Sequence, residues 1–132
     1  MFILDTKLKS DSFFITDLKL SRLLLMNDAN YPWLILVPRK ESVIELVDLA
    51  FDEQVDVLRE INLVGKILRE NFNVEKLNIA ALGNLVKQLH IHVIGRNKND
   101  TTFPKPVWGN APAKTYKKKA ADDLIKKIKS LL

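Results

Sequence analysis

The chain has 132 residues, of which 47% are hydrophobic and 28% charged, a composition typical of one globular domain with a single sizeable core. It holds no cysteine, which excludes disulfide bonds, thiol catalysis and the commonest structural zinc ligands. The formal net charge of +5 arises at the C-terminal end, because residues 1–111 carry fourteen basic and fourteen acidic side chains and residues 112–132 carry seven lysines and two aspartates.

Nothing in the sequence predicts a membrane partner or a secretory route. No apolar run approaches the ~20 residues that span a bilayer. The first residues also lack the basic start and long apolar core of a signal peptide. We therefore expect a cytoplasmic protein in which residues 1–132 form one domain, with a main body over 1–111 and a Lys-rich loop and helix over 112–132. A pI near 9.5 that arises from one terminal segment does not by itself predict a nucleic-acid partner.

The first part of the chain predicts three strands. Residues 12–20, 21–27 and 33–38 are rich in aliphatic, aromatic and β-branched side chains, and the last two segments are separated by Asn, Asp and Pro. The connections are too short for parallel crossovers, so we expect an antiparallel arrangement.

A long helix is predicted over residues 51–72, with Asp52 as its N-cap. Four apolar side chains repeat there with the period of a helix and form one stripe: Val57, Ile61, Val64 and Leu68.

The second half of the chain predicts two more strands and a terminal helix. Residues 76–82 and 85–95 have strand character and are joined by a turn at Gly83 and Asn84. A polar, Pro- and Trp-containing loop follows, and the chain ends in an amphipathic helix. We favour docking of its apolar side on the domain, with solvated lysines, over contact with acidic lipid or RNA. The sum is an α+β fold, with a five-stranded antiparallel sheet, one main helix and one C-terminal helix.

Both histidines of the chain lie in the stretch "QLHIHVIGR", residues 88–96. On a strand, Gln88, His90 and His92 would share one face, with successive side chains roughly 7 Å apart. That spacing suits two rings that hold one phosphoryl group. Two alternatives remain open: a half-exposed strand that happens to carry polar residues, and a metal site. The second lacks the third protein ligand that zinc needs, because the chain has no other histidine and no cysteine.

Two stretches of the sequence resemble a known family. The segment "NLVKQLHIHVIGR" (84–96) is similar to the signature of the histidine triad nucleotide hydrolases and transferases, in which three histidines alternate with apolar residues. The segment "LLLMNDANYPWLILVPRK" (23–40) resembles the strand pair that precedes it in the family. The resemblance covers residues 12 to about 108, and "QLHIH" followed by "FPKPVWG" is most similar to a small bacterial branch with Gln in place of the first histidine.

The resemblance implies a role for each matching residue of the signature. His90 matches the middle histidine and inherits the role of nucleophile. His92 matches the third and inherits contact with the phosphate under attack. Gln88 takes the first position, where it can donate and accept hydrogen bonds but cannot carry a proton. Asn84 matches a polar residue before the signature, so His92, Gln88 and Asn84 form the predicted phosphate site, although Asn84 is also an ordinary turn residue.

Outside the signature the resemblance implies a nucleoside site and one departure. Asn27 and Asp28 lie where the family contacts ribose, although both residue types are also common turn formers. Trp33 stands where the family often has a histidine, and an indole cannot replace that histidine as a phosphate ligand. Arg96 and Lys98 either meet a leaving-group phosphate or are solvated, and we favour solvated side chains. For Trp108 we favour packing over closure of a site.

The predicted function is therefore an enzyme that attacks the α-phosphate of a nucleotide and releases a nucleoside monophosphate. Its substrates would be nucleoside phosphoramidates, dinucleoside polyphosphates or adenylated adducts, with no cofactor and no metal. Family members are usually homodimers, so we expect one here. Two rival functions are a nucleotide-binding module with little or no catalysis and a nucleic-acid-binding protein that uses the lysine-rich helix.

Overall fold

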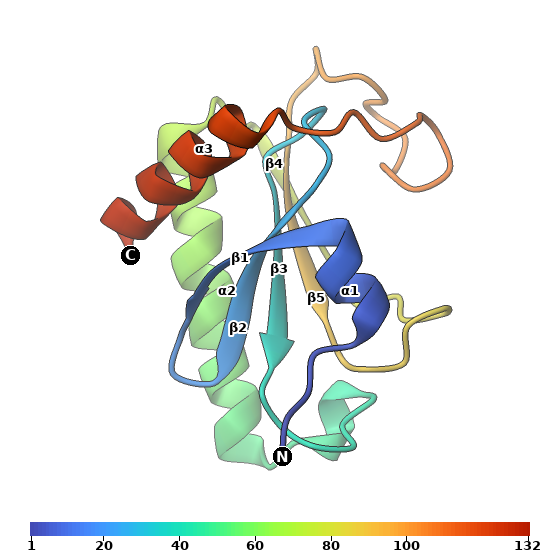
Figure 1. The fold of residues 1–132 in the computed structure, drawn as a ribbon, viewed down its shortest axis with the longest axis vertical. Helices are drawn as coiled ribbons and strands as arrows, with labels where there is room; N and C mark the ends of the chain where they lie inside the picture. Colours follow the sequence, from blue (N-terminus) through green and yellow to red (C-terminus); the bar gives the residue numbers. More distant parts are fainter.

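The computed structural model describes residues 1–132, which form one antiparallel sheet with helices on both faces (Figure 1). The five strands lie in the order β1-β2-β3-β5-β4. They are β1 (Ser12–Asp17), β2 (Ser21–Met26), β3 (Trp33–Pro38), β4 (Lys76–Ala80) and β5 (Ile91–Arg96). The helices are α1 (Thr6–Asp11), α2 (Phe51–Asn71) and α3 (Lys118–Leu131), with a short 3-10 turn η1 (Leu46–Asp48). The predicted α+β class and five-stranded sheet are confirmed.

The order of the strands places β5 between β3 and β4, and this defines the surroundings of the histidines. Ile35 of β3 and Ala80 of β4 both stand opposite His92 of β5. Residue 92 therefore has a paired strand on each side. Because the backbone of a central strand has little freedom, the His92 side chain starts from a well-defined position.

The strand predicted over residues 85–95 is wrong for its first six residues. The strand begins only at Ile91, and residues 81–90 form an irregular connection. The physical reason is the absence of a neighbouring strand, because β4 ends at Ala80 and the backbone N–H of Leu89 donates instead to the carbonyl of Val43 in a loop (3.0 Å). Gly83 adopts a φ of 61° in this connection, a conformation that favours glycine.

Two other local predictions need correction. Asp52 is not the N-cap of α2 but lies in its first turn, while Ala50 occupies the cap position. The Glu53 carboxylate accepts a hydrogen bond from the backbone N–H of Ala50 (3.0 Å), which satisfies a donor that the helix itself leaves free. The sequence also did not predict α1, a six-residue helix capped by the Asp5 carboxylate on the N–H of Lys7 (2.8 Å).

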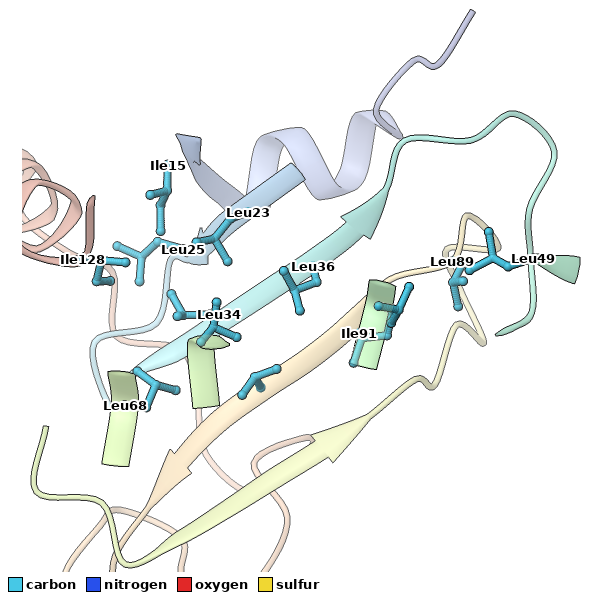
Figure 2. Packing of buried hydrophobic residues seen from close by; sticks show 13 residues of the cluster. Ile15, Leu23, Leu25, Leu34, Leu36, Leu49, Leu68, Leu89, Ile91 and Ile128 are labelled. Atoms are coloured by element: carbon cyan, nitrogen blue, oxygen red, sulfur yellow. The ribbon is translucent and has the colours of Figure 1, made fainter. Parts of the chain in front are cut away.

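The two faces of the sheet pack against different elements. On one face α2 and α3 cover alternate strand residues, as Figure 2 shows for Leu34 near Leu68 of α2 and for Leu25 near Ile128 of α3. The predicted docking of the terminal helix by its apolar side is therefore confirmed, because Ala121 and Ile128 are buried.

The opposite face carries the histidines and is covered by smaller elements. Its apolar residues include Trp33, Ile35 and Ile94 from the strands, joined by Leu8 of α1 and Val107 of the long loop. In Figure 1 the short α1 lies in front of the sheet and α2 behind it. A short helix and loops leave space beside the sheet that a long helix would fill, and His90 and His92 border this space.

A buried carboxylate joins α2 to the turn between β1 and β2. Glu60 of α2 accepts hydrogen bonds from the backbone N–H groups of Leu20 (3.0 Å) and Ser21 (3.1 and 3.2 Å). These contacts fix where the helix crosses the sheet. None of the helices has the length and apolar composition needed to cross a membrane.

Candidate active site

A cavity of about 260 Å³ opens beside the sheet on the face opposite α2, and both histidines line it. Asn84 of the predicted phosphate site also lines it, together with the aromatic ring of Trp108 and the ion pair between Lys7 and Asp11 of α1 (3.0 Å). The remaining wall is mainly apolar: Leu8, Met26, Ile35, Leu82, Leu85 and Val86.

The two imidazole rings lie against each other. Their centroids are 5.0 Å apart and the ring planes are inclined by 76°. This is closer than the spacing along an ideal strand, because His92 lies inside β5 whereas His90 precedes its first residue. His90 is 7% exposed and His92 6% exposed, so both rings are nearly removed from bulk water.

A backbone carbonyl defines the protonation pattern of His90. The Nδ1 atom lies 2.7 Å from the carbonyl oxygen of Gln88. A carbonyl oxygen only accepts hydrogen bonds, so Nδ1 carries the proton and donates. In the neutral ring Nε2 then holds a free lone pair.

His92 is held by a side chain instead. Its Nδ1 atom lies 2.9 Å from Nε1 of Trp33, the first residue of β3. Burial, and secondarily the charge of His90, lower the pKa of His92 to about 4. His92 is therefore a neutral ring at physiological pH. From the sequence, Trp33 is only a missing phosphate ligand, and nothing there predicts this hydrogen bond.

Gln88 does not join the histidines at the cavity. Its Nε2 atom donates to the carbonyl of Ile3 (2.9 Å) and its Oε1 atom accepts from the N–H of Asp5 (2.8 Å). The predicted common face of three side chains is absent because the strand starts after Gln88. The amide instead fastens the segment that leads into α1.

The turn at Asn27 and Asp28 also lies outside the cavity lining, which includes the preceding Met26. The Asn27 side chain accepts from the N–H of Tyr116 (2.8 Å). Asp28 accepts from the N–H of Asn30 (3.0 Å) and of Lys114 (3.2 Å). These bonds are those of a turn that also holds the C-terminal segment, so the structure favours the turn-forming alternative for both residues.

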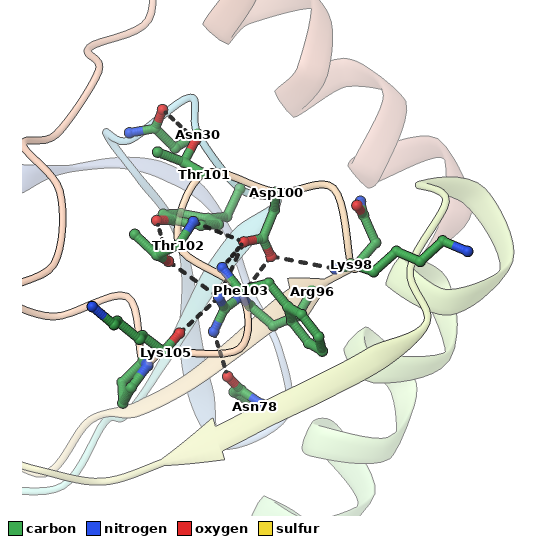
Figure 3. A network of polar contacts seen from close by, with 12 residues as sticks. Asn30, Asn78, Arg96, Lys98, Asp100, Thr101, Thr102, Phe103 and Lys105 are labelled. Atoms are coloured by element: carbon green, nitrogen blue, oxygen red, sulfur yellow. Dashed lines mark hydrogen bonds and ion pairs between the residues drawn. The ribbon is translucent and has the colours of Figure 1, made fainter.

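Arg96 organises the loop that carries Trp108. The guanidinium is 1% exposed and forms an ion pair with Asp100 (2.8 Å), so the expectation of a solvated Arg96 is wrong. It also donates to Asn78 (2.8 Å) and to the carbonyl of Lys105 (2.9 Å), as Figure 3 shows. Its partners come from β4 and from the loop that follows β5, two segments that a reading of local sequence could not bring together.

The loop returns to the histidines after this network. The Trp108 ring lies 5.1 Å from that of His92 and 5.8 Å from that of Trp33. His92 thus has an aromatic ring on two sides and His90 on a third. No group of three or more histidine, cysteine, aspartate or glutamate side chains that could hold a metal ion occurs in the structure.

Comparison with solved structures shows close relatives of the whole chain. A histidine triad protein from Bradyrhizobium japonicum is 42% identical, with a TM-score of 0.95 over 98% of this chain and 96% of the other. A histidine triad protein from Marinobacter aquaeolei is 38% identical, with a TM-score of 0.97 over 100% of this chain and 96% of the other. None of the curated proteins compared with the chain matches it.

More distant structures share the fold. The diadenosine triphosphate hydrolase of Plasmodium falciparum is 22% identical, with a TM-score of 0.68 over 96% of this chain and 77% of the other. The model of the HIT domain matches residues 7–99, a range that contains the strands, α2 and both histidines. On these grounds the chain belongs to the HIT domain family, whose members are generally nucleotide-binding hydrolases or transferases.

Proposed function

We propose that the protein is a nucleotide hydrolase or transferase in which His90 attacks the α-phosphorus of its substrate. The observation that carries the proposal is the arrangement of the two rings at one cavity. The His90 Nδ1–H is occupied by a carbonyl at 2.7 Å, so Nε2 is the nitrogen left free for attack. His92 and Asn84 line the same cavity and supply candidate contacts to the phosphoryl oxygens.

The reaction proceeds in two displacements. The lone pair of His90 Nε2 forms a bond to phosphorus, and the bond from phosphorus to the leaving group breaks with its electron pair, which a proton from solvent then neutralises. Water next attacks the nucleotidyl-histidine and gives up a proton, the N–P bond breaks, and a nucleoside monophosphate is released. Transfer instead of hydrolysis follows when another nucleophile takes the place of water.

The charge of the cavity bears on the substrate. Its lining contains one basic side chain, Lys7, and the ammonium already pairs with Asp11 at 3.0 Å. A polyphosphate chain would leave several negative charges without partners. A nucleoside phosphoramidate or an adenylated adduct, in which one phosphoryl group is attacked, suits this lining better than a dinucleoside polyphosphate.

The test is a panel of these three substrate classes, assayed for monophosphate release with the wild type and with His90→Asn. Asparagine still has an N–H group for the Gln88 carbonyl but no nucleophile, so the variant isolates the chemical role of the ring. We expect at least about a 10³-fold loss of kcat, since loss of a nucleophile removes the covalent route. Intact mass measured during turnover should show a nucleotidyl adduct in the wild type only. Equal turnover by the variant would remove His90 from the mechanism.

The second candidate function is a nucleotide-binding module with little or no catalysis. It is favoured by the position of Gln88, whose amide is bound to the N-terminal segment and not directed to the histidines. Calorimetry would then detect nucleotide binding without turnover of any substrate in the panel. A covalent adduct on His90 would refute this alternative.

We also propose that two copies associate through α2 and the edge of β4. This strand is the last in the sheet, and a groove of about 490 Å³ between it and α2 is lined partly by Ile61, Leu77 and Ile79. Ile79 is 50% exposed, which leaves an apolar side chain in water at an unpaired strand edge. Sedimentation of the wild type and of Ile79→Lys should show a dimer and a shift to monomer, respectively. A wild type that remains monomeric at all concentrations would contradict the proposal.

A further inference from the structure

We infer that Trp33 is a positioning residue, whose indole N–H fixes His92 in the tautomer that presents Nε2–H to the phosphoryl group. The inference rests on the proposed function, because it assumes that a phosphoryl group binds beside His92. The hydrogen bond on which it is built is independent of that function.

The two side chains meet because of the register between β3 and β5. Ile35 pairs with His92 and Trp33 pairs with Ile94, so Trp33 and His92 lie diagonally on the same face of adjacent strands. Their ring centroids are 5.6 Å apart and Nε1 lies 2.9 Å from Nδ1. Trp33 is 4% exposed and His92 6%, so water competes little for this hydrogen bond.

The chemistry of the indole permits only one tautomer of His92 in the hydrogen bond with Trp33. An indole N–H donates and cannot accept, so Nδ1 of His92 must hold a lone pair. The neutral imidazole then carries its proton on Nε2. The other tautomer would place two N–H groups against each other in a buried site and would leave both without an acceptor, which costs several kcal/mol in apolar surroundings.

The indole cannot easily turn away from His92. Tyr31 packs on one side of it at 6.2 Å and Trp108 on another at 5.8 Å, with inclined ring planes. The Tyr31 hydroxyl is hydrogen-bonded to Thr102 at 2.8 Å, in the loop held by Arg96. The donor is therefore held before any ligand arrives, as electrostatic stabilisation of a transition state requires.

The two histidines consequently offer opposite groups to the cavity. His90 donates through Nδ1 and keeps a lone pair on Nε2, whereas His92 accepts through Nδ1 and keeps a proton on Nε2. One ring is suited to attack phosphorus and the other to donate a hydrogen bond to a phosphoryl oxygen. His92 keeps its Nε2 proton while His90 attacks phosphorus, so the hydrogen bond from His92 requires no additional proton acceptor. In the opposite tautomer its lone pair would repel that oxygen.

The experiment compares Trp33→Phe with Trp108→Phe. Both variants remove an indole that packs on the His92 ring, but only Trp33 donates to Nδ1, so Trp108→Phe is the matched control. Long-range ¹H–¹⁵N spectra of protein labelled in its two histidines report the tautomer of each ring directly, and His90→Asn assigns the signals. We expect Nε2–H on His92 in the wild type and in Trp108→Phe, and a mixture of tautomers in Trp33→Phe.

Kinetics of the same variants complete the test. Trp33→Phe should lower kcat about 10- to 10²-fold with little change in KM, because part of the His92 population loses the donor that acts in the transition state. A wild-type His92 protonated on Nδ1 would overturn the inference even if no variant folds. So would an unchanged tautomer in Trp33→Phe, or a changed tautomer with unchanged kcat. A wild type without turnover would refute the proposed function instead, and the spectra would still decide the role of Trp33.

Discussion

The folded protein disfavours protonation of His92. His92 has a pKa of about 4, lowered by burial and by the charge of His90, against an ordinary value of 6.5. Between pH 4 and pH 6.5 the His92 side chain is therefore mostly protonated in the unfolded chain and mostly neutral in the folded protein. The stability that depends on neutral His92 is therefore complete above pH 6.5 and is lost as the pH falls toward 4.

This predicts a specific acid sensitivity. Relative to His92→Gln, the wild type should lose about 3 kcal/mol of unfolding free energy between pH 6.5 and pH 4. Urea denaturation of both proteins at intervals across this range measures the difference. If the two proteins lose stability in parallel, His92 is not the residue responsible.

A second prediction concerns Gln88 as an anchor of the N-terminal segment. Gln88→Ala removes the partners of the Ile3 carbonyl and the Asp5 N–H, so amide exchange in residues 3–11 should accelerate and stability should fall by about 1 kcal/mol. Hydrogen exchange followed by mass spectrometry measures the effect. The control is Lys87→Ala at an exposed neighbouring position, which should leave the exchange of this segment unchanged. Unchanged exchange in Gln88→Ala would show that the segment is held by other contacts.

At the scale of elements, the contact between α2 and the β1–β2 turn depends on one carboxylate. Glu60→Ala leaves the N–H groups of Leu20 and Ser21 without acceptors, and we expect a loss of about 2–4 kcal/mol of stability. Glu60→Gln keeps one acceptor oxygen and should cost clearly less. Chemical denaturation of both variants distinguishes the outcomes, and equal losses would show that packing, not hydrogen bonding, matters at this position.

The loop that carries Trp108 depends similarly on Arg96. Arg96→Met leaves the buried Asp100 carboxylate without its cationic partner, and the expected cost is about 3–5 kcal/mol. Near-ultraviolet circular dichroism should also change, because Trp108 follows the loop that Arg96 holds. Arg39→Met, which removes a half-buried arginine far from this loop, serves as the control. A Trp108 signal that survives Arg96→Met would show that the loop holds its shape by itself.

These elements also show what sequence can and cannot predict. The central strands and α2 follow from local periodicity, since the same apolar side chains that form the pattern fill the core. The start of β5 does not, because it depends on where β4 ends and on the Val43 carbonyl that binds Leu89. The pairing of His90 with His92 was predictable from alternation, whereas the Trp33 hydrogen bond depends on the register of β3 against β5.

At the scale of the whole molecule, the terminal helix belongs to the core. Ile128 of α3 is 1% exposed and packs with residues of the sheet, so Ile128→Ala should cost about 2–4 kcal/mol of stability. Leu131→Ala, in the same helix at 38% exposure, should change stability by much less. Thermal unfolding of the pair measures the difference. Similar small shifts in both variants would mean that the helix docks too weakly to support the sheet.

The positions of the two tryptophans make intrinsic fluorescence a probe of the cavity. The chain has two tryptophans, Trp33 and Trp108, and both rings lie within 6 Å of the His92 ring, at 5.6 and 5.1 Å. All of the intrinsic indole emission therefore originates beside the cavity, with no background from elsewhere. Binding of a nucleotide in the cavity, or protonation of His92, would change this emission. The affinity for the nucleotide and the pKa of His92 can therefore be measured by fluorescence on the unlabelled protein.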